Sequence, residues 1–250
     1  MIKLLIMKNK ILLKNLYEQL CNELDEMNFS SPVSVVYNPL RYAADGFEKY
    51  LFYSEGSKRV IFLGMNPGPW GMAQTGVPFG EVEAVKNFLG FNEIKITPPE
   101  NENNLYKIKG LECPRSEVSG KRLWNLFRER FGTAEKFFME HFVLNYCPLL
   151  FLAQGEKDRV RNFTPDKLKK SEREKLFNSC NACLKKVIEI LKPEYVIGIG
   201  NFAEERAIEA LKDMNIKIIK ILHPSPASPQ SNKNWDGKVT EQLIKSGVWN

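Results

Sequence analysis

The chain has 250 residues, of which 43% are hydrophobic and 26% are charged, and 36 Lys and Arg against 30 Asp and Glu give a net charge of +6. This length and apolar content predict a globular protein with a substantial core and exclude a predominantly disordered chain. The positive balance favours an anionic partner, although many proteins without such a partner share it.

The five cysteines are irregularly spaced, and only Cys180 and Cys183 form a CxxC pair. Because that pair lies inside a helical pattern, buried thiols in a reducing compartment are favoured over zinc or redox chemistry. The N-terminus lacks the cleavage pattern of a signal peptide, and no apolar run is long enough to span a bilayer. We therefore expect an intracellular protein without a membrane partner.

The first third of the chain predicts two helices and a buried strand. A stripe of leucines at four-residue spacing predicts a helix over 8–27. Its members are Leu12, Leu16, Leu20 and Leu24. A second helix is expected over 41–53, and the apolar run 59–63 is typical of a buried strand. Glycines and prolines then recur over 64–80, so a long ordered loop must follow the strand.

The middle of the chain predicts three short helices and a second buried strand. Helices are expected over 81–89, 121–131 and 133–141, and the strand over 142–146. Thr133 stands at the N-cap position of the third helix. The stretch between the first two helices is irregular and contains prolines, and loops of this length are usually functional or mobile.

The last third begins with a charged, exposed segment over 154–161. Thr164-Pro165 then combines an N-cap residue with a first-turn proline, which predicts a helix running to about residue 191. Asn201 and Glu204 resemble a capping box at the start of another helix. In order, the remaining elements are a strand over 195–199, a helix over 201–214, a strand over 216–222 and a helix over 235–245.

Strands separated by helices indicate an α/β protein. We expect a three-layer αβα sandwich, with a mainly parallel central sheet of about four strands, right-handed crossovers and helices on both faces. The sequence shows no linker between domains. We therefore expect a single domain over 1–250, with an N-terminal helical extension over about 1–35.

Four residues stand at or just past the carboxyl ends of the four expected strands: Asn66, Asn145, Gly200 and His223. Each has an ordinary structural interpretation, because an asparagine can satisfy turn or buried backbone groups and a histidine before proline can be a turn residue. Parallel strands, however, bring these positions to one edge of the sheet, where open α/β folds bind their ligands. Together they predict a site at that edge.

Several alternative sites lack their signatures. Gly198-x-Gly200 follows a strand, but the third glycine and the acidic residue of a dinucleotide fold are missing. This argues against a nucleotide-dependent oxidoreductase. The chain has no Walker lysine motif and no nucleophile elbow. With only His141 and His223 present, a histidine-rich metal site is excluded, and we expect no metal.

Two segments resemble the signature motifs of a known family. The first is Gly64-Met-Asn-Pro-Gly68 with its continuation Gly-Met-Ala-Gln-Thr-Gly-Val-Pro-Phe-Gly80, and the second is His223-Pro-Ser-Pro226. They resemble the uracil-DNA glycosylase superfamily, and most closely its single-strand-selective monofunctional members. The stretches 111–120, 145–153 and 229–233 agree, and the likeness runs from about Tyr37 to near the C-terminus.

The resemblance implies a DNA glycosylase that excises uracil and oxidised or deaminated derivatives such as 5-hydroxymethyluracil, with no metal, no cofactor and no lyase step. Asn66 matches the residue that positions the attacking water, and His223 matches the residue that stabilises the departing base. The implied base-binding residues are Met65, Gly68, Phe79 and Asn145. In the family, the phenylalanine stacks on the flipped base, the second asparagine reads its edge, and the backbone of the other two shapes the pocket.

The implied partner is DNA with a damaged base, single-stranded in preference to duplex. The resemblance also implies a monomer, in the cytoplasm or nucleoid of a bacterium or the nucleus of a eukaryote. Residues expected to contact its backbone are Pro67, Ser225, Pro226, Ala227, Ser228, Asn232 and Lys233. Lys157, Arg159 and Arg161 are a further candidate set, for which an ordinary solvated charge cluster is equally favoured. Ala227 departs from the family, whose better-known members carry a wedging arginine there, so we expect weaker action on duplex DNA. The alternative is a catalytically silent binder of nucleic acid or nucleotide on the same fold, against which the retained Asn66 and His223 argue.

Overall fold

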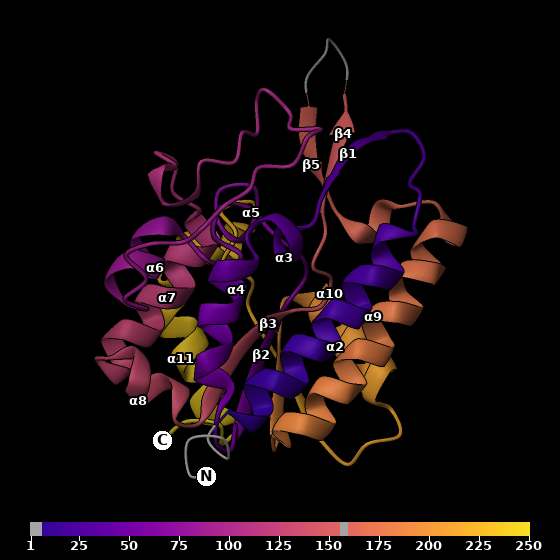
Figure 1. The fold of residues 1–250 in the computed structure, drawn as a ribbon. Coiled ribbons are helices and arrows are strands. Elements are labelled where there is room, and N and C mark those ends of the chain that lie inside the picture. The colour runs from indigo at the N-terminus through magenta and orange to yellow at the C-terminus, as the bar shows by residue number, and fades with distance from the viewer. Residues whose placement is uncertain (1–6, 156–159) are drawn as a thin grey trace.

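A parallel sheet of four strands forms the centre of the molecule (Figure 1). The computed structural model describes residues 7–155 and 160–250. The strands are β2 (Val60–Gly64), β3 (His141–Asn145), β6 (Tyr195–Ile199) and β7 (Lys217–Ile221), in the spatial order β3-β2-β6-β7. The register places Gly64 opposite Asn145, so the carboxyl ends of the neighbouring strands β2 and β3 lie side by side. These four strands agree with the four that the apolar runs predict.

Helices cover both faces of this sheet, as the alternating pattern predicts. The helices are α2 (Lys8–Asp25), α3 (Pro39–Tyr42), α4 (Ala44–Tyr50), α5 (Met72–Thr75), α6 (Val82–Asn87), α7 (Val118–Phe131), α8 (Ala134–Phe138), α9 (Lys170–Leu191), α10 (Asn201–Leu211) and α11 (Trp235–Lys245). In Figure 1, α2, α9 and α10 lie to the right of the sheet, while α6, α7, α8 and α11 lie to the left. The three-layer αβα architecture is therefore confirmed.

A second, antiparallel sheet was not predicted. It consists of β1 (Val33–Tyr37), β4 (Leu150–Gln154) and β5 (Val160–Phe163), in the order β1-β4-β5. Gln154 and Arg161 are exposed, as expected of the charged segment 154–161, but the two described ends of that segment belong to β4 and β5, which the sequence analysis did not predict. The apolar run at β4 follows Cys147-Pro148 directly, and this proline made the whole stretch look like a loop.

Two predicted helices differ in detail from the observed ones. The buried stripe of α2 includes Leu13 but not Leu12, which is 40% exposed. Near the start of the helix the core-facing position is therefore Leu13, one residue after the leucine that the four-residue spacing selects. The helix expected over 41–53 is broken into α3, α4 and a 3-10 turn over Leu51–Ser54.

The predicted helix starts are correct only in part. Thr133 caps α8 as predicted, and its side chain accepts a hydrogen bond from the Lys136 backbone N–H at 3.3 Å. Thr164-Pro165, by contrast, starts a 3-10 turn, and α9 begins at Lys170. The capping box at Asn201 was wrong, because the N-cap of α10 is Gly200, which supplies a φ of 85° and no side chain.

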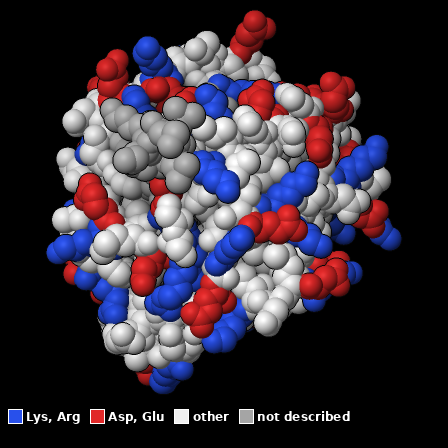
Figure 2. All heavy atoms as spheres, turned by 60° about the horizontal axis from the view of Figure 1, so that its bottom comes forward, with Lys and Arg blue, Asp and Glu red and all other residues white. Residues whose placement is uncertain are grey.

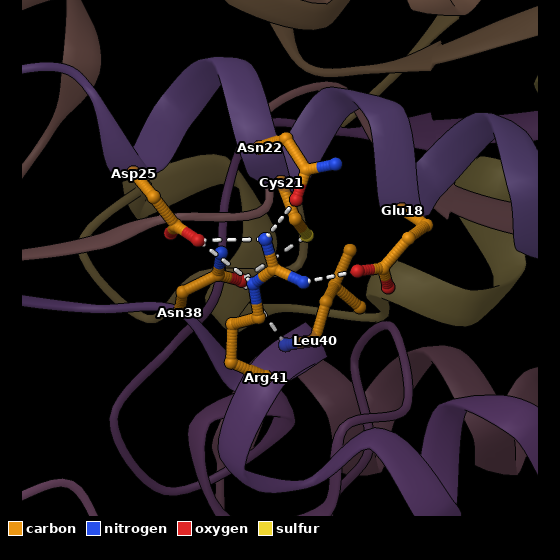
Figure 3. Close-up of polar contacts among 7 residues, drawn as sticks. All are labelled: Glu18, Cys21, Asn22, Asp25, Asn38, Leu40 and Arg41. Atoms are coloured by element: carbon orange, nitrogen blue, oxygen red, sulfur yellow. Dashed lines mark hydrogen bonds and ion pairs between the residues drawn. The ribbon is translucent and has the colours of Figure 1, made fainter.

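An arginine ties the N-terminal helix to the rest of the fold (Figure 3). Arg41 of α3 forms ion pairs with Asp25, at 2.7 Å, and with Glu18, and it donates to the side-chain oxygen of Asn22 at 2.6 Å. All three partners project from α2. Asn38 accepts from the Leu40 backbone N–H at 3.1 Å and so caps α3 next to this cluster.

The face below the amino ends of the strands carries mixed charge. Figure 2 turns the bottom of Figure 1 toward the viewer and shows Lys and Arg interspersed with Asp and Glu. Both signs alternate among the described residues of this face, which show no broad area of one charge that would attract a polyanion. Among the described residues, no helix is long and apolar enough to cross a membrane.

Candidate active site

A cavity of about 240 Å³ lies at the carboxyl edge of the parallel sheet. It is lined by Met65, Asn66, Pro67, Gly68, Phe79, Glu117, Ser119, Asn145, Asn162, Thr164, His223 and Ser225. The sequence placed Asn66, Asn145 and His223 at one edge, and the structure brings all three to the wall of one cavity. The volume is below the roughly 300–1,000 Å³ of pockets for drug-sized ligands, so it suits a single small ring.

The amide of Asn66 is held in one orientation by the backbone. Its Nδ2 donates to the Leu149 carbonyl at 3.0 Å, which points the Oδ1 end of the carboxamide the other way. The loop around it is fixed because the pairing of β2 with β3 continues past the strands: the Cys147 N–H donates to the Met65 carbonyl at 2.9 Å. An amide fixed in this way offers an acceptor that can orient a water molecule.

The amide of Asn145 is buried and only half satisfied. Its Nδ2 lies 3.2 Å from the Met72 thioether, a weak acceptor, and its Oδ1 has no hydrogen-bond partner among the described residues. A Cβ on the neighbouring Gly64 would lie 2.5 Å from this Oδ1, so only glycine permits the amide to lie there. Buried polar atoms are normally paired, so this unpaired Oδ1, on a side chain that lines the cavity, leaves the amide with hydrogen-bonding capacity for a ligand.

Phe79 is held in a left-handed backbone conformation with φ of 53°. For a residue with a bulky side chain this costs about 1–2 kcal/mol, so the surrounding structure must stabilise it. The Trp124 indole donates to the Phe79 carbonyl at 3.0 Å. The same oxygen packs so closely against Gly120 that a Cβ on this glycine would lie 2.2 Å from it. These contacts fix the ring against Gly64 at the cavity wall.

The ring of His223 is neutral and its tautomer is defined. Burial lowers the pKa of His223 to about 4. Its Nδ1 accepts a hydrogen bond from the Ser225 backbone N–H at 3.0 Å, so the single proton of the neutral ring belongs on Nε2. Gly200 makes room for the ring, because a Cβ there would lie 3.1 Å from Cβ of His223. The neutral histidine can therefore act as a hydrogen-bond donor.

Glu117 is a cavity residue that the sequence analysis missed. Burial, with a smaller contribution from Glu81, raises the pKa of Glu117 to about 7. Its Oε2 is buried and has no partner among the described residues, and Oε1 lies where a Cβ on Gly68 would come within 1.5 Å. The sequence did contain one signal, the glycines of the 64–80 loop, which leave space beside that loop. It did not indicate that the side chain of Glu117 fills this space.

The loop after β7 is braced from α7. Arg122 donates to the Pro224 carbonyl at 2.8 Å and to the Asn232 side-chain oxygen at 3.3 Å, and Asn232 in turn donates to the Pro226 carbonyl at 3.0 Å. Both ends of the Asn232 amide are therefore used within the loop. Of the other residues expected to contact DNA, Pro226, Ala227 and Lys233 are exposed, while Ser225 lines the cavity and Ser228 is half-buried.

The second candidate set of cations is only partly described. Arg161 is exposed on β5 and does not line the cavity, whereas its neighbour Asn162 does, together with Thr164. Lys157 and Arg159 lie outside the described residues. The contribution of β5 to the cavity was not predicted, because the strand itself was missed.

Metal ligands do not gather at the site or elsewhere in residues 7–155 and 160–250. No three His, Cys, Asp or Glu side chains there form a group that could hold a metal ion. The polar groups of the cavity wall are amides, hydroxyls, one imidazole and one carboxyl.

Comparison with known families assigns the chain. The sequence model of the uracil DNA glycosylase superfamily matches residues 52–244, which include the whole 64–80 loop and the loop after β7. The chain belongs to the uracil DNA glycosylase superfamily. The likeness found in two short motifs therefore extends over most of the fold.

Curated members of the uracil DNA glycosylase superfamily are similar over almost the whole chain. The single-strand selective monofunctional uracil-DNA glycosylase of Rattus norvegicus is 45% identical over 229 residues, which cover 90% of this chain and 81% of the rat protein. The Mus musculus protein of the same name is 45% identical and covers 90% and 80%, and the Bos taurus protein is 46% identical and covers 92% and 84%.

A solved structure shows the same fold at low identity. The crystal structure of wild-type Pedobacter heparinus SMUG2 superposes with a TM-score of 0.67 and 13% sequence identity, and covers 94% of this chain and 97% of its own. At that identity the likeness supports the fold of the superfamily and does not transfer individual residues.

Proposed function

We propose that the protein is a monofunctional DNA glycosylase that hydrolyses the N-glycosidic bond of uracil, and of oxidised or deaminated derivatives, in DNA. The observation that carries this proposal is the meeting of Asn66, Asn145 and His223 around one cavity of about 240 Å³. The names of the rat, mouse and bovine relatives agree with it and add a preference for single strands.

Recognition of the base follows from the half-satisfied amide of Asn145. Uracil presents an N–H beside a carbonyl on its pairing edge, so one carboxamide can accept from the first and donate to the second. The unpaired Oδ1 of Asn145 is buried, and a rotation of the amide toward the cavity would make it the acceptor that N3–H of uracil needs. Cytosine carries the reverse pattern and would leave buried groups unpaired, which is the strongest form of discrimination that such a site offers. The ring of Phe79 supplies the stacking surface.

Bond breaking is assigned to His223 and Asn66. As the glycosidic bond breaks, negative charge develops on the base and positive charge on the sugar. The neutral imidazole, with its proton on Nε2, donates to the base oxygen that becomes negative, as donors in an oxyanion hole do. Asn66 cannot be a strong base, but its fixed Oδ1 accepts from a water and orients it. We therefore infer a dissociative reaction in which water attacks late.

Access to the cavity requires that the base leave the DNA stack, which costs a few kcal/mol in a duplex and less in a single strand. Ala227, at the exposed tip of the loop after β7, is too short to fill the space that a base vacates. We therefore propose a preference for single-stranded DNA. A protein that repairs DNA works where the genome lies, and we propose an intracellular monomer.

A uracil-containing single-stranded oligonucleotide tests the proposal. Incubation with the protein followed by alkali should cleave the strand at uracil, and omission of alkali should leave it intact because no lyase step occurs. An oligonucleotide with thymine in place of uracil is the matched control. Binding without cleavage would overturn the proposal and favour the silent binder.

A further inference from the structure

A second hollow adjoins the active-site cavity and has no assigned role. It has a volume of about 170 Å³, and its wall includes Trp70, Leu105, Lys107, Lys109 and Arg115. The same two chain segments build both hollows. Gly68 lines the active-site cavity and Trp70 lines this one, two residues further on, and Arg115 and Glu117 are related in the same way. Two residues span at most about 7 Å, so the two hollows are neighbours.

Flat groups stack at the wall of this hollow. The ring of Trp70 stacks on Tyr106, with centroids 5.3 Å apart and planes at 15°, and the Arg115 guanidinium carbon lies 4.4 Å from the Trp70 centroid. Arg115 is exposed, and so is the side chain of Leu105, at 59%. A planar cation and an apolar side chain therefore remain accessible to a ligand beside an aromatic stack.

The charge of the hollow is unbalanced. Lys107, Lys109 and Arg115 are all exposed, and none of them forms an ion pair within the described parts of the chain. No carboxylate lines the hollow. A nearby carboxylate, Glu102, accepts from the Ile108 backbone N–H at 2.6 Å and pairs with none of the three cations. Three unpaired cations next to aromatic rings match a ligand that carries both an aromatic ring and an anionic group.

The hollow is rigidly attached to the active-site loop. Gln74, which is fully buried, donates to the Pro69 carbonyl at 2.9 Å and to the Lys107 carbonyl at 3.1 Å, and accepts from the Lys109 N–H at 2.8 Å. Tyr106 is fixed in addition by a hydrogen bond from its hydroxyl to the Val160 carbonyl at 3.1 Å. A surface held in this way loses little freedom when it binds a ligand.

We propose that this hollow binds the unpaired base next to the target nucleotide of a single strand, with the base on the exposed Arg115 guanidinium that covers Trp70 and its phosphate near Lys107 and Lys109. This inference rests on the proposed function, since it places a DNA strand at the neighbouring cavity. A neighbouring base in a duplex is paired and stacked inside the helix, so it cannot enter. The hollow would therefore strengthen binding of single-stranded DNA and not of duplex DNA.

Neighbouring-base removal tests the proposal. Each single-stranded oligonucleotide carries one uracil. The nucleotide immediately 5′ of the uracil, or the one immediately 3′ of it, is replaced by an abasic tetrahydrofuran spacer, which removes the base and keeps the phosphate. For the wild-type protein, kcat/KM should fall about tenfold at one of these positions, in the range for one base on an aromatic stack. If no spacer changes kcat/KM by more than about twofold while uracil is still released, this inference fails and the proposed function stands.

Two matched variants locate the effect. Arg115→Gln should abolish most of the difference between base and spacer, and so should Trp70→Leu. Arg130→Gln is the control, because that guanidinium also lies 4.4 Å from a tryptophan centroid, at Trp249, and does not line either hollow. It should keep the full difference. Full retention of the difference in Arg115→Gln and Trp70→Leu would overturn the inference.

A binding measurement keeps the test independent of catalysis. The dissociation constants of the same oligonucleotides, measured by fluorescence anisotropy, should show the same tenfold dependence on one neighbouring base, and the same loss in Arg115→Gln. If the protein released no uracil at all, the proposed function would fail, while this comparison would still decide whether the hollow holds a base.

Discussion

Replacement of Glu117 by glutamine should stabilise the protein at alkaline pH and much less at acidic pH. The pKa of this buried carboxyl rises from its usual value of 4.5 to about 7. In the unfolded chain the group ionises at its ordinary pKa, so between these two values the folded state binds more protons than the unfolded state. Stability contributed by the neutral form is therefore full below about pH 4.5 and is lost as pH rises toward 7.

The size of this effect follows from the two pKa values. A difference of about 2.5 pH units at 1.36 kcal/mol per unit gives about 3 kcal/mol as the cost of burying the charged carboxylate above about pH 8. Glutamine has nearly the same shape but cannot ionise. Any cost of burying its amide group is the same at every pH, so only the change of the difference with pH reports the carboxylate.

Urea unfolding of the wild type and Glu117→Gln at several pH values measures this difference. The gap in unfolding free energy should shift in favour of the variant by about 2.5 kcal/mol between about pH 5 and about pH 8.5. Glu112→Gln, which makes the same replacement at an exposed position in the same segment, is the matched control, and the shift is taken as the excess of Glu117→Gln over it. A gap for Glu117→Gln that is constant with pH would refute the reasoning from burial.

Three further predictions concern the reaction. Asn66→Ala should lose most of its turnover and keep its affinity for a uracil-containing strand; near-normal turnover would remove this amide from the mechanism. His223→Ala should lower kcat roughly 100- to 1000-fold, as loss of one preorganised donor does. Because the pKa of His223 lies at about 4, the wild-type rate should show no histidine titration near pH 6.5, and an ascending or descending limb there that vanishes in His223→Ala would contradict a neutral donor. Wild-type activity should be lower on duplex than on single-stranded DNA at matched salt, and Ala227→Arg should narrow that difference; equal wild-type rates on both forms would contradict the inference from Ala227.

The strand ends were predictable because buried parallel strands have a strong local signal. The runs ending at Leu63, Tyr146, Ile199 and Leu222 are apolar and are followed by turn residues, so the sequence alone placed Asn66 and His223 at one edge of the sheet. The precise wall of the cavity was not predictable in this way. It depends on which distant segments fold back over the edge.

Neither the antiparallel sheet nor the burial of Glu117 could be predicted from the sequence. β1 pairs with β4 across more than 100 residues of chain, for which no local pattern exists, whereas β5 pairs with β4 as the next strand along the chain but is short and carries polar residues. Glu117 lies in an irregular polar stretch, where a glutamate is ordinarily exposed. Its burial results from Gly68 and Gly71, which give up side-chain volume in another loop. Such a complementarity is visible only after both loops are placed.

The hydrogen bond from Asn66 to the Leu149 carbonyl has a consequence for the evolution of this fold. The acceptor immediately precedes β4, so the orientation of the amide that we propose to orient the water is set by the antiparallel sheet and not by the parallel one that carries the motif. A change of length between Cys147 and Leu150 would turn that carbonyl away while leaving every signature residue in place. Descendants with an insertion there would therefore keep the motif and lose the chemistry.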